Sequence, residues 1–472
     1  MSECQLHTTT ISLNKDEFYY AYKELTKHKA HHILMESGRG GQFSVAGWNP
    51  LAIVRSIEGG LHIEWRNGTV EERHGEALYL LEQLVAEFQF QHIDDLPDFQ
   101  GGAAGFITYD YARQIETLPN DTEDDLHIPD LFFYLLDQWA VLDIEKETVH
   151  IMHLSNVEVD LRAETEKWQH AATKGLASRV FSPGIGTEVP EDDAELYVSM
   201  TGPSFEKSVS RVQSYISQGD VFQVNLSVRQ SKALSVSPMV YYEALRSFNP
   251  SPYMSYIQSP EFVVVSGSPE LLVKKKGDEL STRPIAGTRP RGKDEAEDER
   301  LAKELIDNEK ERAEHVMLVD LERNDLGRVS AYGSVDVNEF MVIEKYSHVM
   351  HIVSNVRGTL AENTSNAEVI RAVFPGGTIT GAPKIRTMEI IEELEPVRRG
   401  LYTGSIGWLG YTGDLEFNIV IRTAFVQDGV AHIQAGAGIV IDSIPENEYI
   451  ESLNKAKALW QAKAMAEGLG RV

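Results

Sequence analysis

The sequence contains a single cysteine, Cys4, among its 472 residues. One cysteine excludes an internal disulfide framework, a zinc site built from cysteines and an iron–sulfur cluster. A thiol nucleophile could only be Cys4, and chain termini are usually loosely held. We therefore do not expect catalysis by cysteine.

Long apolar runs are also missing. The most apolar segment, residues 130–143, is interrupted by Asp137 and is too short to span a bilayer. The first residues lack the basic stretch and the apolar stretch that mark a signal peptide. We expect a cytoplasmic protein without a membrane partner.

Positive charge is scarce, because 44 Lys and Arg stand against 72 Asp and Glu and give a net charge of −28. Such a chain repels phosphate backbones and anionic lipids, so no nucleic-acid partner is expected. An anionic substrate would need a local device, such as a metal ion or a correctly directed Lys or Arg.

The length suggests about three domains or two large ones. Residues 179–204 are rich in proline, glycine and acidic residues and are typical of a linker. The sequence therefore predicts an N-terminal region over 8–178, a linker over 179–204 and a catalytic domain over 205–464.

Runs of strands joined by tight turns, with helices grouped around them, favour an α+β fold. We expect an antiparallel-sheet sandwich flanked by helices, with the N-terminal region packed on the catalytic core. Residues 222–229 alternate apolar and polar side chains, which predicts a strand with one polar face.

Two predicted helices, 295–321 and 446–468, each carry a Glu-x-x-Glu pair. A spacing of three places both carboxylates of a pair on one helix face. Carboxylate-rich sites suit Mg²⁺, but solvated charged faces are common and equally explain each pair alone. Lys455 follows one turn after the second pair, either as a salt-bridge partner or as a ligand of a substrate carboxylate. The pairs are Glu311 with Glu314 and Glu448 with Glu451.

Three single residues have both a chemical and a structural interpretation. Glu270 directly follows an apolar strand, so partial burial would raise its pKa and suit a general acid; a surface position is the alternative. His351 is either a proton shuttle or a packed core residue. Arg422 either binds a carboxylate in bidentate fashion or forms a structural salt bridge.

Nine segments of the second half resemble the chorismate-utilising enzymes, the family of anthranilate, aminodeoxychorismate, isochorismate and salicylate synthases. The motifs occur in the family's order and span 205–460, which makes the resemblance specific. The N-terminal region resembles that of the two amine-forming branches. The motifs are SGSPELL, RPIAGTRPRG, KERAEHVMLVDLERNDLG, SHVMHIVS, FPGGTITGAPK, GSIGWLGY, NIVIRT, QAGAGIV and EYIESLNKA.

The resemblance implies roles for the charged residues. Glu314 and Glu451 would bind Mg²⁺ directly, and Glu311 and Glu448 would hold its waters. The ion would bind the ring carboxylate of chorismate. The enolpyruvyl carboxylate and its neighbours would be held by Tyr402, Arg422, Lys455 and the backbone amides around Gly436 and Gly438.

The resemblance also implies a general acid. Glu270 would protonate the departing C4 hydroxyl of chorismate, with His351 and Thr378 lining the pocket beside it. Because Glu270, Glu314 and Glu451 are all present, a non-catalytic relative is disfavoured.

Family members that add water to chorismate carry a lysine base where this chain has Gln223. Ammonia needs no such base, so Gln223 indicates an amine-forming enzyme. Ammonia usually comes from glutamine through a cysteine nucleophile, which this chain lacks. The resemblance therefore implies a separate glutamine amidotransferase subunit, in a heterodimer.

Two residues divide the amine-forming branches. Ala286 in PIAGT matches the anthranilate synthase form, whereas the familiar aminodeoxychorismate synthases have a lysine there that attacks C2. Asn225 in FQVNLS resembles the aminodeoxychorismate synthases, as does GRGGQFSVAGWNP near the N-terminus. We favour formation of 4-amino-4-deoxychorismate for p-aminobenzoate and folate synthesis, with anthranilate synthesis as the alternative.

Two segments match the feedback pocket for tryptophan in anthranilate synthases. The implied ligand is tryptophan, and the alternative is that both segments only pack the two halves together. The residues are Glu36, Ser37, Asn249, Pro250, Tyr253 and Met254.

Overall fold

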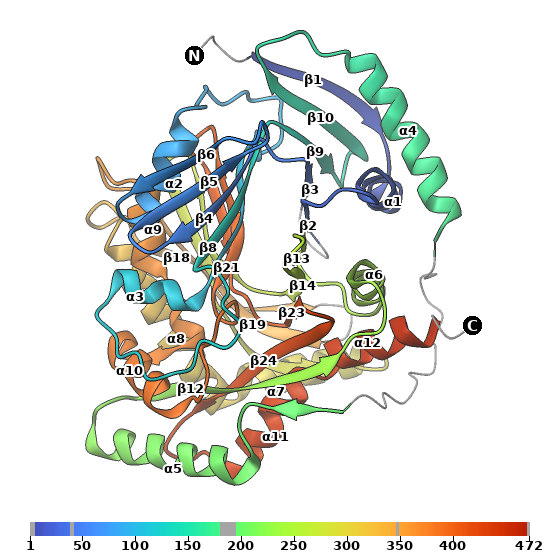
Figure 1. Ribbon diagram of the computed structural model, residues 1–472. Coiled ribbons are helices and arrows are strands. Elements are labelled where there is room, and N and C mark those ends of the chain that lie inside the picture. Colours follow the sequence, from blue (N-terminus) through green and yellow to red (C-terminus); the bar gives the residue numbers. More distant parts are fainter. Residues whose placement is uncertain (1–4, 38–41, 180–194, 346–348, 470–472) are drawn as a thin grey trace.

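The computed structural model describes residues 5–37, 42–179, 195–345 and 349–469. Cys4 and most of the predicted linker lie outside these ranges. Two antiparallel sheets of twelve strands each face one another, with helices around them (Figure 1). The predicted α+β sandwich is therefore confirmed.

The first sheet holds strands from both sides of the predicted linker. Its strands follow the order β1 (Gln5–Ser12), β10 (Thr148–Ser155), β9 (Gln138–Asp143), β3 (Phe43–Trp48), β2 (His32–Glu36), β13 (Tyr253–Gln258), β14 (Val263–Ser268), β23 (Thr423–Gln427), β24 (Val430–Ile439), β12 (Gln223–Ala233) and β11 (Tyr197–Val198), and β20 (Gly381–Ala382) pairs with β12.

The second sheet also holds strands from both sides of the predicted linker. Its order is β17 (Ile285–Pro290), β19 (Val349–Thr359), β16 (Glu279–Arg283), β15 (Leu271–Lys276), β22 (Leu415–Asn418), β21 (Ser405–Gly410), β7 (Gly102–Ile107), β8 (Leu131–Leu136), β4 (Ala52–Ile57), β5 (Gly60–Trp65) and β6 (Val70–His74), and β18 (Asp336–Lys345) pairs with β19. The division at 179–204 stays a prediction, but it does not separate the sheets.

Helices cover the edges and outer faces of the sheets (Figure 1). No helix among the described residues is both long and apolar enough to cross a bilayer. The helices are α1 (Lys15–Thr26), α2 (Ala77–Ala86), α3 (Ala112–Ile115), α4 (Leu161–Ala177), α5 (Gly202–Gln218), α6 (Pro238–Phe248), α7 (Glu295–Asp307), α8 (Glu309–Gly327), α9 (Asn366–Val373), α10 (Lys384–Leu394), α11 (Pro445–Lys455) and α12 (Lys457–Leu469), with 3-10 turns η1 (Tyr109–Tyr111) and η2 (Gly377–Ile379).

Two predicted long helices are each broken in two. The helix predicted over 295–321 ends at Asp307, and Asn308 caps the start of α8 by accepting a hydrogen bond from the Glu311 amide at 3.1 Å. The predicted C-terminal helix breaks at Ala456, between α11 and α12. The sequence pattern missed these breaks because the helical spacing of apolar residues continues across them. At the first break, Asn308 serves as an N-cap, a position that asparagine favours over the helix interior.

Aromatic side chains from both halves fill the space between the sheets. Phe99 packs edge-on against Trp139 and Trp408, with ring centroids 6.2 and 5.2 Å apart. Phe133 meets Phe417 at 6.2 Å. The apolar core is therefore shared by both sides of the predicted linker.

Gly105 in β7 tests how closely neighbouring strands of the second sheet are paired. A Cβ there would lie 2.0 Å from the Phe132 carbonyl oxygen, so alanine must push β7 and β8 apart. We expect Gly105→Ala to lower the free energy of unfolding by about 1–3 kcal/mol, measured by thermal or urea unfolding.

Gly327 at the end of α8 is the matched control, because a Cβ there meets no atom within 4 Å. Gly327→Ala should be neutral or slightly stabilising. Equal unfolding midpoints for the two variants would contradict the tight pairing of β7 with β8.

Candidate active site

The predicted general acid lies where the chain crosses from one sheet to the other. Strand β14 of the first sheet ends at Ser268 and β15 of the second begins at Leu271, which leaves Glu270 at the crossing. A second crossing, between β22 and β23, carries Arg422. The Ile419 amide donates to the Glu270 carbonyl at 2.9 Å, so the two crossings run side by side.

Glu270 is buried, with 6% of its surface exposed, so the surface alternative is wrong. Burial raises the pKa of its carboxyl to about 7, and the Thr378 hydroxyl and the Arg422 charge offset only part of that effect. A carboxyl with this pKa is populated in both forms near neutral pH, as a general acid requires.

His351 in β19 belongs to the same group. Burial lowers its pKa, and the nearby Arg422 charge acts in the same direction, so the ring is neutral. Its Nδ1 lies 2.9 Å from the Gly287 carbonyl oxygen and therefore carries the proton. Nε2 is then the acceptor nitrogen. His351 is both a buried residue and a neighbour of Arg422, so both predicted roles remain compatible.

Arg422 has a positive φ of 51°, a backbone conformation that costs energy for a residue with a side chain. Its carbonyl accepts a hydrogen bond from the Gly267 amide at 3.0 Å, which helps to hold that conformation. Its charge acts on both Glu270 and His351. The chain thus maintains a strained residue beside the two predicted catalytic groups.

Four buried polar atoms near this crossing have no hydrogen bond of ordinary geometry within the described residues. Buried side-chain oxygens and nitrogens normally find partners, so these four atoms are available to a ligand or to water. The atoms are Glu270 Oε1, Thr378 Oγ1, Gln223 Oε1 and Asn225 Oδ1.

The two predicted substrate-binding glycines of QAGAGIV, Gly436 and Gly438, lie in strand β24. Strand pairing sets Gly438 opposite Asn225 and Gly436 opposite Ser227. A Cβ on Gly438 would lie 2.2 Å from Gln223 Nε2, and one on Gly436 would lie 2.6 Å from Asn225 Oδ1. The glycines therefore make room for these polar side chains.

The polar face of the predicted strand is confirmed, but it is buried. Gln223, Asn225 and Ser227 in β12 are 5%, 9% and 1% exposed. Ala286, which divides the amine-forming branches, pairs with Ile352 in β19, beside His351. It is buried, so a larger residue there would displace its neighbours.

The two carboxylate pairs approach one another across α8 and α11. The pKa of Glu314 is raised, first by burial and then by the charge of Glu311, with a further contribution from Glu451. Within the described ranges, no three Asp, Glu or His side chains form a metal-binding group. The predicted roles of Glu311, Glu314, Glu448 and Glu451 stay predictions.

Cations lie beside these carboxylates. Lys455 Nζ is 2.9 Å from Glu451 Oε1 and donates to the Gly436 carbonyl at 2.8 Å, so the predicted salt bridge is present. Arg289 Nη1 lies 3.3 Å from Glu311 Oε1. An open cavity of about 440 Å³ is lined by Glu451 and Lys455 together with three neighbours on α11. A small anionic ligand could reach Lys455 from solvent there.

The predicted tryptophan segments lie on one wall of a cavity of about 910 Å³. Glu36, Ser37, Tyr253 and Met254 line it, whereas Asn249 and Pro250 do not. Met254 pairs with Glu36 across strands β13 and β2, which confirms that the segments join the two halves. Tryptophan as a ligand stays a prediction.

The sequence motifs did not point to one further buried carboxylic acid, Glu322. Glu322 on α8 is 2% exposed and accepts a hydrogen bond from the Thr282 hydroxyl at 3.0 Å. Burial raises its pKa to about 8, with smaller contributions from Asp325 and Glu270. A signal was present, because Glu322 shares the buried helical stripe of Leu318.

Comparisons with known proteins point to one enzyme family. The family model for chorismate binding enzymes matches residues 30–461. The chain is 51% identical to aminodeoxychorismate synthase component 1 of Bacillus subtilis, over 97% of both chains. It is 45% identical to anthranilate synthase component 1 of Thermus thermophilus, over 95% of both.

Among solved structures, anthranilate synthase component I from Streptococcus pneumoniae matches with a TM-score of 0.74 and 35% identity, covering 90% of this chain and 93% of that one. An isochorismate synthase from Bacillus anthracis, 21% identical with a TM-score of 0.65, covers 95% of this chain and 100% of that one and shares the fold.

The buried Glu270 makes a prediction about stability. Its native pKa of about 7 exceeds the ordinary 4.5, so the unfolded chain loses its proton first as pH rises. The native state therefore loses stability between pH 4.5 and 7, by roughly 3 kcal/mol in all. The side chain of Glu270→Gln cannot ionise, so this variant should be more stable than the wild type at pH 8. The advantage should be much smaller at pH 5.5.

Unfolding in urea at both pH values measures this difference. Exposed Glu362 is the control, and Glu362→Gln should give the same small change at either pH. A Glu270→Gln advantage that does not shrink on acidification would show that the buried carboxyl is not neutral in the native state.

Proposed function

Since this chain belongs to the chorismate binding enzyme family, we propose that it converts chorismate and ammonia to 4-amino-4-deoxychorismate. The observation that carries the proposal is the match to the Bacillus subtilis aminodeoxychorismate synthase component 1 along almost the whole chain. The site supports it, because Gln223 stands where water-adding relatives carry a lysine base.

The chemistry required is exchange of a hydroxyl for an amine at C4. Hydroxide is a poor leaving group, so Glu270 donates its proton and the hydroxyl leaves as water. Ammonia forms the new C–N bond and then releases one proton, which restores the Glu270 carboxyl. His351, neutral and with Nε2 as acceptor, is placed to receive a hydrogen bond in the pocket. The balance is chorismate plus ammonia to product plus water.

We propose that Arg422, Tyr402 and Lys455 bind the enolpyruvyl carboxylate side of chorismate. Arg422 and Lys455 supply positive charge for an anionic substrate, in a chain whose net charge is −28. The buried Tyr402 supplies a hydroxyl whose raised pKa keeps it protonated. These groups would hold the substrate while Glu270 acts.

Mg²⁺ is proposed as the cofactor. The raised pKa of Glu314 reflects burial together with the charges of Glu311 and Glu451, which fits residues that bind a divalent cation. Mg²⁺ commonly uses only one or two carboxylates and takes its other ligands from water and substrate. When bound, the ion would neutralise the ring carboxylate of chorismate.

The ammonia would come from a separate glutamine amidotransferase. Both curated relatives are named as component 1, and Cys4 is the only cysteine of this chain. We also propose a cytoplasmic location.

The deciding experiment incubates the purified chain with chorismate, Mg²⁺ and ammonium at alkaline pH. We expect p-aminobenzoate to form only when aminodeoxychorismate lyase is added. Anthranilate fluorescence without the lyase would establish the alternative, which Ala286 favours. Unchanged chorismate would exclude both activities.

Substitutions of the carboxylates test the cofactor. Glu314→Gln and Glu451→Gln should each lower turnover at least about 100-fold and weaken Mg²⁺ binding measured by calorimetry, because each removes a charged oxygen ligand. Glu309 is exposed at the start of α8, the helix that carries Glu314, so Glu309→Gln should change neither turnover nor Mg²⁺ affinity. Wild-type Mg²⁺ affinity in both site variants would refute the assignment.

A further inference from the structure

Arg399 and Glu395, two residues without a predicted role, form a buried ion pair next to the site. Arg399 is 4% exposed and Glu395 is 5% exposed. The guanidinium donates through Nε and Nη2 to the two carboxylate oxygens, at 3.0 and 2.7 Å. Planar, bidentate pairs of this kind fix geometry as well as charge.

The pair holds strand β12 by its backbone. Arg399 Nη2 donates to the Asn225 carbonyl at 2.6 Å. Glu395 Oε1 accepts from the Ser227 amide and hydroxyl at 2.9 and 2.8 Å. Asn225 and Ser227 pair with Gly438 and Gly436, so the ion pair sets the position of the strand that carries Gln223.

The same guanidinium reaches two further segments of the site. Nη1 donates to the Ile379 carbonyl at 3.1 Å, next to Thr378. The Tyr402 ring lies 5.4 Å from the guanidinium carbon, and the Tyr109 ring lies 5.0 Å from it. One buried cation thus contacts three separate parts of the chain that hold predicted site residues.

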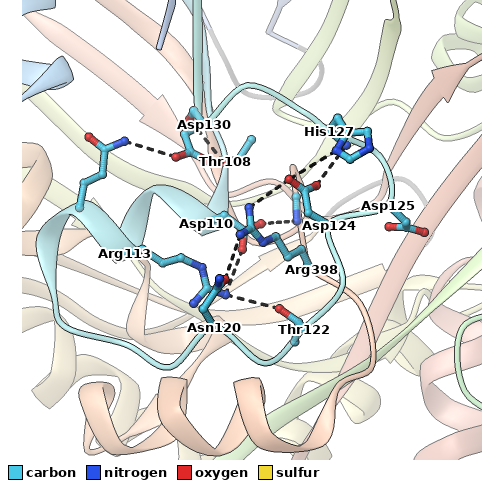
Figure 2. Close-up of polar contacts among 12 residues, drawn as sticks. Thr108, Asp110, Arg113, Asn120, Thr122, Asp124, Asp125, His127, Asp130 and Arg398 are labelled. Carbon is cyan, nitrogen blue, oxygen red and sulfur yellow. Dashed lines mark hydrogen bonds and ion pairs between the residues drawn. The ribbon is translucent and has the colours of Figure 1, made fainter. Parts of the chain in front are cut away.

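The residues flanking Arg399 are held by the N-terminal region. The Gly400 amide donates to Asp110 Oδ2 at 2.8 Å. Arg398 donates to Asp124 at 3.1 Å and to Asn120 at 2.9 Å (Figure 2). The segment that presents Arg399 is therefore fixed from outside as well as from the site.

We infer that Arg399 is a positioning residue for the proposed amination, holding Tyr402, Thr378 and strand β12 in one arrangement. The inference rests on the proposed function. Lysine offers a single ammonium point in place of a planar fork, so it cannot span Glu395, Asn225 and Ile379 together. Loss of one contact would let the site segments move relative to one another.

The test compares Arg399→Lys with the wild type, using ammonium as the nitrogen donor. We expect kcat/KM to fall about 100-fold, mainly through kcat, because small misplacements of reacting groups cost this much. Arg246→Lys is the matched control, since Arg246 is half-buried, with 13% of its side chain exposed, contacts both Glu36 oxygens and stacks on Tyr19 at 4.4 Å. It should lose thermal stability but keep kcat and KM within about twofold.

A second variant covers the case in which Arg399→Lys does not fold. Glu395→Gln keeps the shape and an oxygen acceptor for Ser227 but removes the charge, and we expect a fall in kcat of about 10-fold. Unchanged kcat in both variants, or an equal fall in Arg246→Lys, would overturn the inference.

Calorimetry separates this outcome from failure of the proposed function. A wild type that binds chorismate without forming product would refute amination and, with it, the role of Arg399 in that reaction. A wild type that forms the product, with an unchanged kcat in Arg399→Lys, would overturn the inference alone. A wild type that does not bind chorismate would overturn both.

Discussion

Backbone pairing between strands that are distant in the sequence holds this molecule together. Strand β7 pairs with β21 in one sheet, and β2 pairs with β13 in the other, so each sheet joins early and late parts of the chain. Neither half of the chain can complete either sheet alone. The large loop-closure entropy of such pairing is offset by a core in which aromatic rings from both halves meet.

The site follows from that constraint. Glu270 and Arg422 lie where the chain leaves one sheet and enters the other, and the backbone bond from Ile419 to Glu270 ties the crossings together. Residues at a crossing are freed from the alternation of a strand, so their side chains can be buried without joining the apolar core. Burial then raises the pKa of Glu270 and keeps its proton available.

The sequence predicted the fold class and the strand of Gln223, because alternation of apolar and polar side chains is a local signal. For Glu270 it left burial with a raised pKa and a surface position both open, and only the family resemblance favoured the buried acid. It did not predict which way the polar face of β12 points. Alternation is usually satisfied by solvent, whereas here Asn225 and Ser227 face a buried polar network. The breaks at Asn308 and Ala456 were missed because helical spacing continues across them. The roles of the carboxylate pairs came from the family resemblance, not from spacing.

The partners of Arg399 were beyond the reach of the sequence for a different reason. Its contacts with Asn225, Ile379 and Tyr109 are set by tertiary structure, and nothing in the spacing of PVRRG distinguishes Arg399 from Arg398. Yet Arg398 binds the N-terminal loop and Arg399 binds the site. The two adjacent arginines contact different parts of the molecule, and together they link the N-terminal region to strand β12. The N-terminal region therefore supports the segment that carries Arg399, in addition to completing both sheets.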